Sequence, residues 1–267
     1  MASRFGSARN AYEKNDLELS RRAHTSGVIK KHVHPEEHGD EKSQYLGEFV
    51  YGAIDGAVTT FAVVAGATGA ALSSGVVIIL GFANLIADGF SMAVGNFISE
   101  RTQRDFIRKE RTREEWEVDH VPEGEREEIR EIFRKKGFKG KELERVVEVI
   151  TSDKKVWVDT MMVDELGLLE SQKSPWKSAG ATYFGFILIG LIPLLSYVVS
   201  AFFPLPNPFF IAIILTGIAL FAVGAVKRFV TKTSLWKSAF ETVFIGGAAA
   251  VIAYYVGFFL RWVVTVA

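Results

Sequence analysis

Hydrophobic and polar residues are strongly segregated along this chain. Five apolar runs are long enough, or nearly long enough, to cross a bilayer, at residues 49–72, 76–98, 179–203, 209–226 and 242–260. A membrane-spanning helix needs about 20 such residues. The pattern therefore predicts an all-α integral membrane protein with five transmembrane helices.

The charged residues collect in one insert between the second and third apolar runs. Residues 101–178 hold 19 acidic and 18 basic side chains, out of 31 of each in the 267-residue chain. No Gly or Pro follows Glu100 until Pro122, so the second span is expected to continue as a helix beyond the bilayer. Further helices are expected at 123–136, 141–150 and 154–168, and Pro193 is expected to kink the third span.

The positions of Lys and Arg predict the topology. The loops at 73–75 and 204–208 carry no charge, whereas the N-terminal tail, the insert and residues 227–237 are rich in basic side chains. The positive-inside rule then places the N-terminus and the insert in the cytoplasm and the C-terminus outside or in a lumen. We expect a cytoplasmic tail, two spans, a cytoplasmic helical domain and three spans, at 1–47, 48–100, 101–178 and 179–267.

Two aspartates interrupt the first two spans. Asp55 and Asp88 are the only charged residues between positions 49 and 99, and each is followed by glycine. A charged side chain in a bilayer core is costly unless it faces a pathway or a partner. Glycine lets another helix or an ion approach the backbone closely. Two such aspartates in neighbouring spans indicate a route for a cation.

A polar stripe follows the second span. Asn84, Asp88, Met92 and Asn96 recur at every fourth position, so their side chains share one broad face of the helix. For asparagine and methionine, hydrogen bonding and packing between helices are the more common roles. The charged aspartate is less easily explained in that way, since contacts between helices rarely require a charge.

Acidic side chains of the insert fall on the same side of their helices as apolar ones. Glu114 and Glu117 lie on the side of Ile107, and Glu125 and Glu128 lie on the side of Ile129. Carboxylates on a packed side need a cation or a basic partner to offset their desolvation. Each pair is spaced at i,i+3, which is close enough to chelate one ion jointly.

Thioethers and a further carboxylate come from the last helix of the insert. Met161, Met162 and Glu165 lie at helical spacing, and the chain has no cysteine, so thiolate sites are excluded. Carboxylate with thioether favours a divalent first-row ion over Ca²⁺ or Mg²⁺. An ordinary amphipathic bundle with Arg–Glu pairing fits the same spacing, and on geometry alone both interpretations stand.

The N-terminal tail carries a histidine cluster. His32, His34 and His38 could bind a divalent ion, because imidazole suits first-row metals. A flexible polar tail with incidental histidines also fits, and is favoured by the few large apolar residues there.

The combined motifs resemble the vacuolar iron transporter family. The resemblance rests on the runs Gly-Ala-Ile-Asp-Gly at 52–56 and Ser-Met-Ala-Val-Gly at 91–95, on the spacing Glu-x2-Glu-x7-Glu-x2-Glu from Glu114 to Glu128, and on Met-Met-x2-Glu from Met161 to Glu165. It covers about residues 45–267. Asn84 stands where the family pattern has a glutamate, and Asp88 stands where a small residue is usual.

The resemblance implies a homodimer that exports Fe²⁺ from the cytosol in exchange for protons, with Mn²⁺ as a second substrate. Asp55 and Met92 would line a pathway at the dimer interface, with Asp88 and Asn84 beside them and Glu48 at its entrance. Ions would be collected at the cytoplasmic mouth by Glu114, Glu117, Glu125, Glu128, Met161, Met162 and Glu165. It implies no enzyme activity, no prosthetic group and no nucleic-acid partner. The membrane would be the plasma membrane in a prokaryote and the vacuolar membrane in a eukaryote.

Two alternatives from other functional classes remain at this point. In the first, the insert senses or stores metal and the spans only anchor it, which would leave the intramembrane aspartates without a role. In the second, Asp55 and Asp88 form the opposed pair of an intramembrane aspartyl protease, which would leave the acidic insert unexplained.

Overall fold

The computed structural model describes residues 11–12, 14–23, 25, 45–169, 173–231 and 234–266. The chain divides into two compact units, Met1–Gly47 and Glu48–Ala267. The first unit contains the short helix α2 (Leu17–Ala23). The predicted histidine cluster of the tail lies outside the described residues. All regular structure in the described part of the chain is helical.

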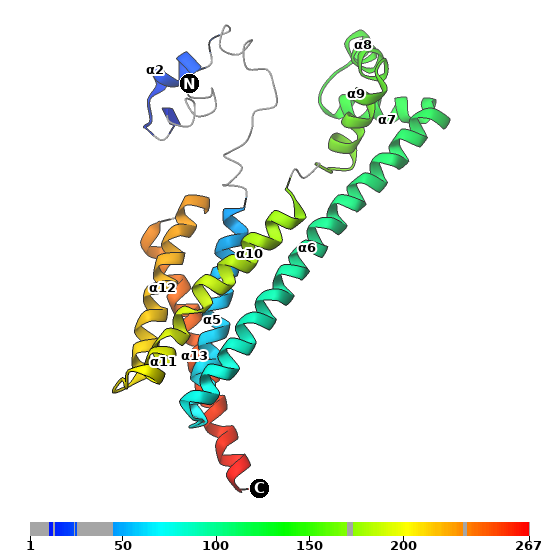
Figure 1. Cartoon of the computed structure of the whole chain (residues 1–267). Helices are drawn as coiled ribbons and strands as arrows, with labels where there is room; N and C mark the ends of the chain where they lie inside the picture. The colour runs from blue at the N-terminus through cyan, green and yellow to red at the C-terminus, as the bar shows by residue number, and fades with distance from the viewer. Residues whose placement is uncertain are drawn as a thin grey trace. The chain divides into compact units, whose positions relative to one another are not determined.

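Four helices of the second unit are long and apolar enough to cross a membrane (Figure 1). They are α5 (Leu46–Gly69), α6 (Ser74–His120), α12 (Pro208–Thr231) and α13 (Leu235–Val266). A fifth candidate span is formed by α10 (Pro175–Gly190) with α11 (Ile192–Phe202). The structure therefore contains four to five candidate spans, and α13 extends at both ends beyond the predicted range of 242–260.

The kink predicted at Pro193 is present. The α10–α11 pair bends by 45°, and Pro193 lies in the first turn of α11. Proline has no backbone N–H to continue the hydrogen-bond ladder of α10, and its ring disfavours helical continuation before it. The chain therefore ends one helix at Gly190 and begins the next at Ile192.

Helix α6 passes from the membrane region into the insert without a break. Its 47 residues correspond to roughly 70 Å of helix, which is more than twice the thickness of a bilayer core. The predicted extension beyond the second span is confirmed, because no glycine or proline interrupts the second half of the helix. One rigid element thus carries both Asp88 and the acidic residues of the insert.

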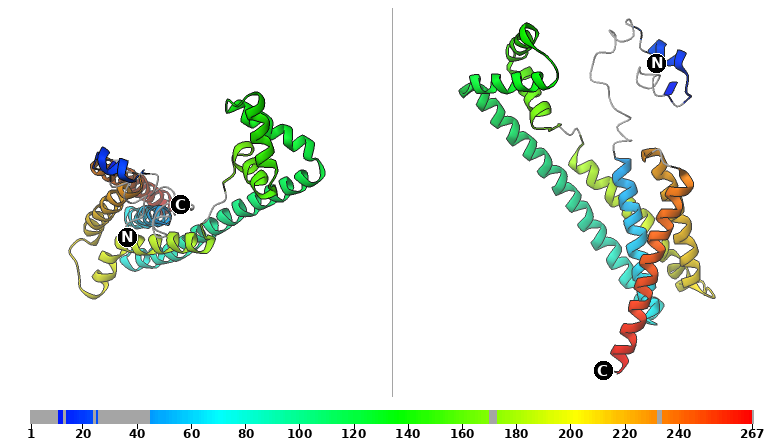
Figure 2. Two further views of the ribbon diagram at one scale, coloured as in Figure 1. Left: turned by 90° about the horizontal axis from the view of Figure 1, so that it is seen from above. Right: turned by 180° about the vertical axis from the view of Figure 1, so that it is seen from behind.

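The close contacts between spans are built on glycines. A Cβ atom at Gly52 would lie 2.1 Å from the Thr182 carbonyl oxygen, and one at Gly56 would lie 2.3 Å from the Phe186 carbonyl oxygen. Helix α10 therefore packs backbone to backbone against α5. It also runs along α6, and the two helices lie side by side in each view (Figure 2). The Asn96 amide donates a 2.6 Å hydrogen bond to the Thr182 hydroxyl across that contact.

The insert is a small helical bundle packed on the distal half of α6 (Figure 1). It consists of α7 (Pro122–Lys135), α8 (Gly140–Thr151), α9 (Lys154–Thr160) and the π-helix η1 (Met161–Glu165). Its core is apolar and includes Ile107 of α6, Ile129 of α7 and Trp157 of α9. Gly137, with φ at +103°, ends α7 where the sequence predicts.

The last helix of the insert differs from its prediction. A single α-helix is expected at 154–168, but the winding loosens after Thr160, and the N–H of Leu166 bonds the carbonyl of Met161 five residues back. Hydrophobic periodicity cannot reveal this change. A single π-helical turn differs from an α-helical turn by one residue, and it needs no special amino-acid composition. Short π-helical turns occur frequently at functional sites.

Candidate metal-transport site

The two intramembrane aspartates lie near each other on adjacent helices. Asp55 of α5 and Asp88 of α6 are both half-buried, and they are close enough for their charges to interact. Among the described residues, neither carboxylate has a side-chain hydrogen bond or an ion pair. Two carboxylates in candidate membrane spans are costly unless they face a pathway or a partner, so this pair is the candidate cation site of the spans.

One residue of α10 lies against the glycines of both Asp–Gly pairs. Phe186 is fully buried. Its backbone lies against Gly56, and its ring lies 3.0 Å from the position that a Cβ at Gly89 would take. In this structure both glycines make room for α10, Gly56 for its backbone and Gly89 for the Phe186 side chain.

The residues of the polar stripe on α6 have different surroundings. Asn96 is committed to its hydrogen bond with Thr182. Met92 is half-buried and packs against the buried apolar cluster of the spans, which includes Leu85 and Phe186. The amide nitrogen of Asn84 is buried and lacks a hydrogen-bond partner in the described structure. Asn96 therefore forms a hydrogen bond between helices, which is the role expected for an asparagine in a membrane span.

Glu48 lies at the beginning of α5 and holds a basic partner. Its Oε1 is 2.6 Å from the Lys173 Nζ, and its side chain is 12% exposed. The second oxygen, Oε2, is buried and lacks a hydrogen-bond partner among the described residues. The ion pair joins the start of α5 to the segment that leads into α10, a long-range contact that the sequence does not reveal.

The acidic side chains of the insert converge from three elements. Glu114 and Glu117 come from α6, Glu125 and Glu128 from α7, and Glu165 from η1. Their charges act on one another. Glu114 and Glu125 are 2% and 7% exposed, which confirms the predicted position on the packed side for these two carboxylates. We call these five residues the carboxylate cluster.

Burial and mutual repulsion alter the acidity of the cluster. Burial, and then the charges of Glu128, Glu114, Glu117 and Glu165, raises the pKa of Glu125 to about 7. Burial also raises the pKa of Glu114, although the neighbouring Arg113 partly offsets this effect. The pKa of Glu165 is raised by partial burial of its carboxyl group and by Glu128. A divalent cation would relieve this repulsion.

The geometry nevertheless departs from the predicted ligand set in three ways. Glu128 and Glu165 are exposed, and Glu128 lies about 100° around the helix from the buried Ile129. Met161 and Met162 are 0% and 4% exposed and belong to the insert core. In the described part of the chain, no three Asp, Glu or His side chains are grouped closely enough to hold a metal ion as they stand.

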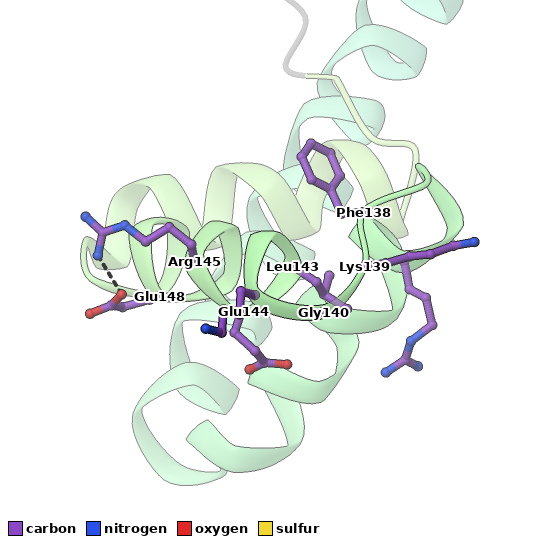
Figure 3. Close-up of a pocket in the computed structure, with 9 residues that line it drawn as sticks. Phe138, Lys139, Gly140, Leu143, Glu144, Arg145 and Glu148 are labelled. Carbon is purple, nitrogen blue, oxygen red and sulfur yellow. Dashed lines mark hydrogen bonds and ion pairs between the residues drawn. The ribbon is translucent and has the colours of Figure 1, made fainter.

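A separate hollow at the α7–α8 junction contains none of the predicted ligands. Its volume is about 1020 Å³, and its lining includes Arg134, Lys139, Lys141, Arg145 and Glu148. Figure 3 shows Arg145 paired with Glu148 on its rim. Acidic and basic side chains are mixed there, so the hollow lacks the uniform negative charge that would attract a cation.

Comparison of the sequence with known proteins places this chain in a family. The VIT family model matches residues 46–258. A vacuolar iron transporter of Toxoplasma gondii (strain ATCC 50861 / VEG) is 36% identical over 267 residues, covering 96% of this chain and 88% of that protein. The chain belongs to the VIT family. The resemblance inferred from the motifs is therefore confirmed.

Two further VIT relatives extend the comparison. A vacuolar iron transporter of Plasmodium berghei (strain Anka) is 34% identical over 95% of each chain. Vacuolar iron transporter 1 of Arabidopsis thaliana is 34% identical over 82% of this chain and 88% of that protein. Membership of a transporter family excludes the aspartyl protease alternative, and the chain is not an enzyme.

Sequence reasoning about this VIT protein missed the basic partners of its acidic residues. Arg113 contacts three glutamates of α6, and Lys173 binds Glu48. Two of the Arg113 contacts could have been found, since Arg113 stands at i+3 from Glu110 and at i−4 from Glu117, whereas helical spacing does not predict the contact with the adjacent Glu114. The contact of Lys173 with Glu48 depends on tertiary structure.

The raised pKa of Glu125 makes the stability of the metal-free protein depend on pH. An unfolded glutamate titrates near 4.3, so between about pH 4.5 and pH 7 the folded protein retains a proton that the unfolded chain releases. The free energy of unfolding therefore falls as the pH rises through this window. Glu125→Gln keeps the side chain neutral, so we expect a flatter pH profile and a higher melting temperature than the parent at pH 8.

This prediction is measured by thermal unfolding of the full chain in detergent with chelator, from pH 5 to pH 8. Glu144→Gln is the matched control, because Glu144 is an exposed residue whose pKa is lowered by its hydrogen bond to Arg130. Equal slopes for the parent and Glu125→Gln would show that Glu125 is not the group responsible.

Proposed function

We propose that this VIT protein exports Fe²⁺ from the cytosol by proton antiport. The observation that carries the proposal is the continuity of α6, which bears Asp88 in its membrane-spanning half and Glu114 and Glu117 of the carboxylate cluster in its other half. Roughly 40 Å of helix separates the two sites. A cluster of negative charge at the cytoplasmic mouth raises the local concentration of cations before they enter the pathway.

The cytoplasmic station takes up Fe²⁺ as substrate. Carboxylate oxygens from α6, α7 and η1 bind the ion, and their side chains must move together to do so, because no three of them are grouped closely enough among the described residues. The buried thioethers of Met161 and Met162 lie at the start of the π-helix. A change in that loosened turn would bring sulfur to the ion, and sulfur favours first-row metals over Ca²⁺ or Mg²⁺.

The membrane station consists of Asp55 and Met92, with Asp88 and Asn84 on the same stripe and Glu48 at its cytoplasmic end. Protonation of Asp55 or Asp88 from the far side would lower the negative charge and release the metal. That exchange couples proton entry to metal exit. The family pattern has a glutamate at the position of Asn84. Asp88 lies one helical turn away, so this chain keeps a carboxylate on the same face of α6.

A second copy of the chain completes the pathway in this proposal. Large apolar side chains of α6, including Ile79, Ile86 and Phe90, are exposed in the single chain. Lipid or a partner helix must cover them. The family resemblance and the position of Asp88 on the same helix support a homodimer with α5 and α6 at its interface. The N-terminus and insert lie in the cytosol, and the names of the relatives support a vacuolar membrane.

The direct test is metal flux into proteoliposomes that contain a metal-sensitive dye. We expect Fe²⁺ uptake that increases when an outward proton gradient is imposed and falls when the gradient is collapsed, with slower uptake of Mn²⁺. Both ions accept oxygen-rich sites, so ligand type alone does not separate them. Metal binding without flux above protein-free vesicles would favour the alternative of a membrane-anchored sensing or storage protein.

A further inference from the structure

Arg113 of α6 lies among the glutamates of its own helix. Its Nη2 donates a 2.7 Å hydrogen bond to the Oε1 of Glu114, and its Nε lies 3.3 Å from the Oε2 of Glu110 and 3.8 Å from the Oε2 of Glu117. One guanidinium thus contacts three carboxylates. Two of these belong to the carboxylate cluster.

The contact with Glu114 differs from an ordinary surface ion pair. The Glu114 side chain is 2% exposed, while that of Arg113 is 48% exposed. A buried carboxylate is strongly destabilised unless a cation or a hydrogen-bond donor compensates its charge. By contrast, Arg111 and Glu115 form an i,i+4 pair in which both members are substantially exposed. Such pairs contribute little to stability.

The other basic residues near the cluster are engaged elsewhere. Arg111 binds Asp159 of α9 at 2.5 Å, Lys136 binds Asp164 of η1, and the guanidinium of Arg126 lies over the Trp157 ring. In the described part of the chain, Arg113 is the basic residue whose ion pair reaches Glu114. Its half-exposed side chain also has space to turn toward solvent.

We propose that Arg113 is an exchangeable counterion that sets the affinity of the carboxylate cluster for divalent metal. Without metal, its guanidinium neutralises Glu114 and Glu117. When a divalent cation arrives, the Arg113–Glu114 hydrogen bond breaks, the carboxylates bind the ion, and the guanidinium moves to solvent beside Glu110. The inference rests on the proposed function, because it assumes that the cluster binds the transported ion.

Competition of this kind has a consequence for transport. Each binding event must displace the guanidinium that already compensates Glu114, so the affinity for metal is lower than the carboxylate cluster would otherwise provide. When the ion leaves, Arg113 returns and compensates the exposed charge. The cluster can therefore load and release ions repeatedly rather than retain them. Arg113 acts as a positioning residue and does not itself bind metal.

The test compares Mn²⁺ binding to the full chain in detergent by isothermal titration calorimetry, with Mn²⁺ used because it resists oxidation. Removing the competing charge in Arg113→Gln is expected to tighten binding about tenfold. Arg113→Lys keeps the charge without the bridging geometry and is expected to fall between this variant and the parent. Arg145→Gln is the matched control, because Arg145 pairs with the exposed Glu148 of α8.

Thermal unfolding supplies a second measurement. Without metal, Arg113→Gln is expected to melt below the parent, because Glu114 loses its partner. With saturating Mn²⁺ its melting temperature should rise by more than that of the parent, since tighter binding stabilises the folded state further. A purely structural role would lower both melting temperatures and leave the metal-induced rise unchanged.

Glu114→Gln separates failure of this inference from failure of the proposed function. If Glu114→Gln binds Mn²⁺ as tightly as the parent, the carboxylate cluster is not a metal site. If Glu114→Gln loses binding while Arg113→Gln binds equally or more weakly than the parent, the metal site stands and the counterion role of Arg113 is wrong. Tighter binding in Arg113→Gln together with loss in Glu114→Gln supports both.

Discussion

Asp55→Asn is expected to reduce Fe²⁺ flux into proteoliposomes by about a hundredfold, on the scale at which loss of a metal-site group acts. The substitution removes one negative charge and preserves the shape of the side chain. The Asp55 carboxylate has no basic partner within the described structure, so its charge is available to a passing cation. Because the neighbouring contact between Gly56 and Phe186 is untouched, the variant should fold and melt like the parent.

Two further variants show whether the effect belongs to the pathway. Thr59→Val is the matched control one turn along α5, where the hydroxyl only donates to the backbone carbonyl of Asp55, and it should transport normally. Asp88→Asn should lose less flux than Asp55→Asn if Asp88 assists release rather than coordination. A folded Asp55→Asn protein that transports as fast as the parent would rule out the proposed pathway.

Much of the fold could be predicted because it follows from composition and periodicity. The apolar runs mark the spans, and the absence of Gly and Pro after Glu100 predicts the long extension of α6. Gly137 and Pro193 mark breaks for reasons local to the backbone. The π-helical turn at Met161 could not be foreseen, because it depends on how the insert core packs rather than on residue type.

The site could be predicted only in part, for a similar reason. Helical spacing correctly placed Glu114 and Glu125 on packed faces. The two Asp–Gly pairs could be recognised because they are the only charged positions in the first two apolar runs. It did not reveal that both pairs meet Phe186, since that contact joins three helices from distant parts of the chain. Met161 was predicted as a ligand and is fully buried in the insert core, where periodicity cannot distinguish a packed thioether from a coordinating one.

Gly56→Val is expected to destabilise the folded protein by about 3 kcal/mol, the upper end of the usual cost of overpacking. A Cβ atom at this position would lie 2.3 Å from the carbonyl oxygen and 2.8 Å from the Cα of Phe186. These are backbone atoms of α10, so neither can move aside without separating α5 from α10. The yield of monodisperse protein on size exclusion and the melting temperature should both fall.

Two other glycines provide a graded comparison. At Gly89 the nearest obstacle is the Phe186 ring at 3.0 Å, and at Gly95 nothing lies within 4 Å. Because a side chain can rotate away while backbone cannot, the loss of stability should decrease in the order Gly56→Val, Gly89→Val, Gly95→Val. Equal stability of Gly56→Val and Gly95→Val would show that α10 does not need this close approach. Gly56→Val should thus lose folded protein, whereas Asp55→Asn, one residue away, should lose flux and keep its fold.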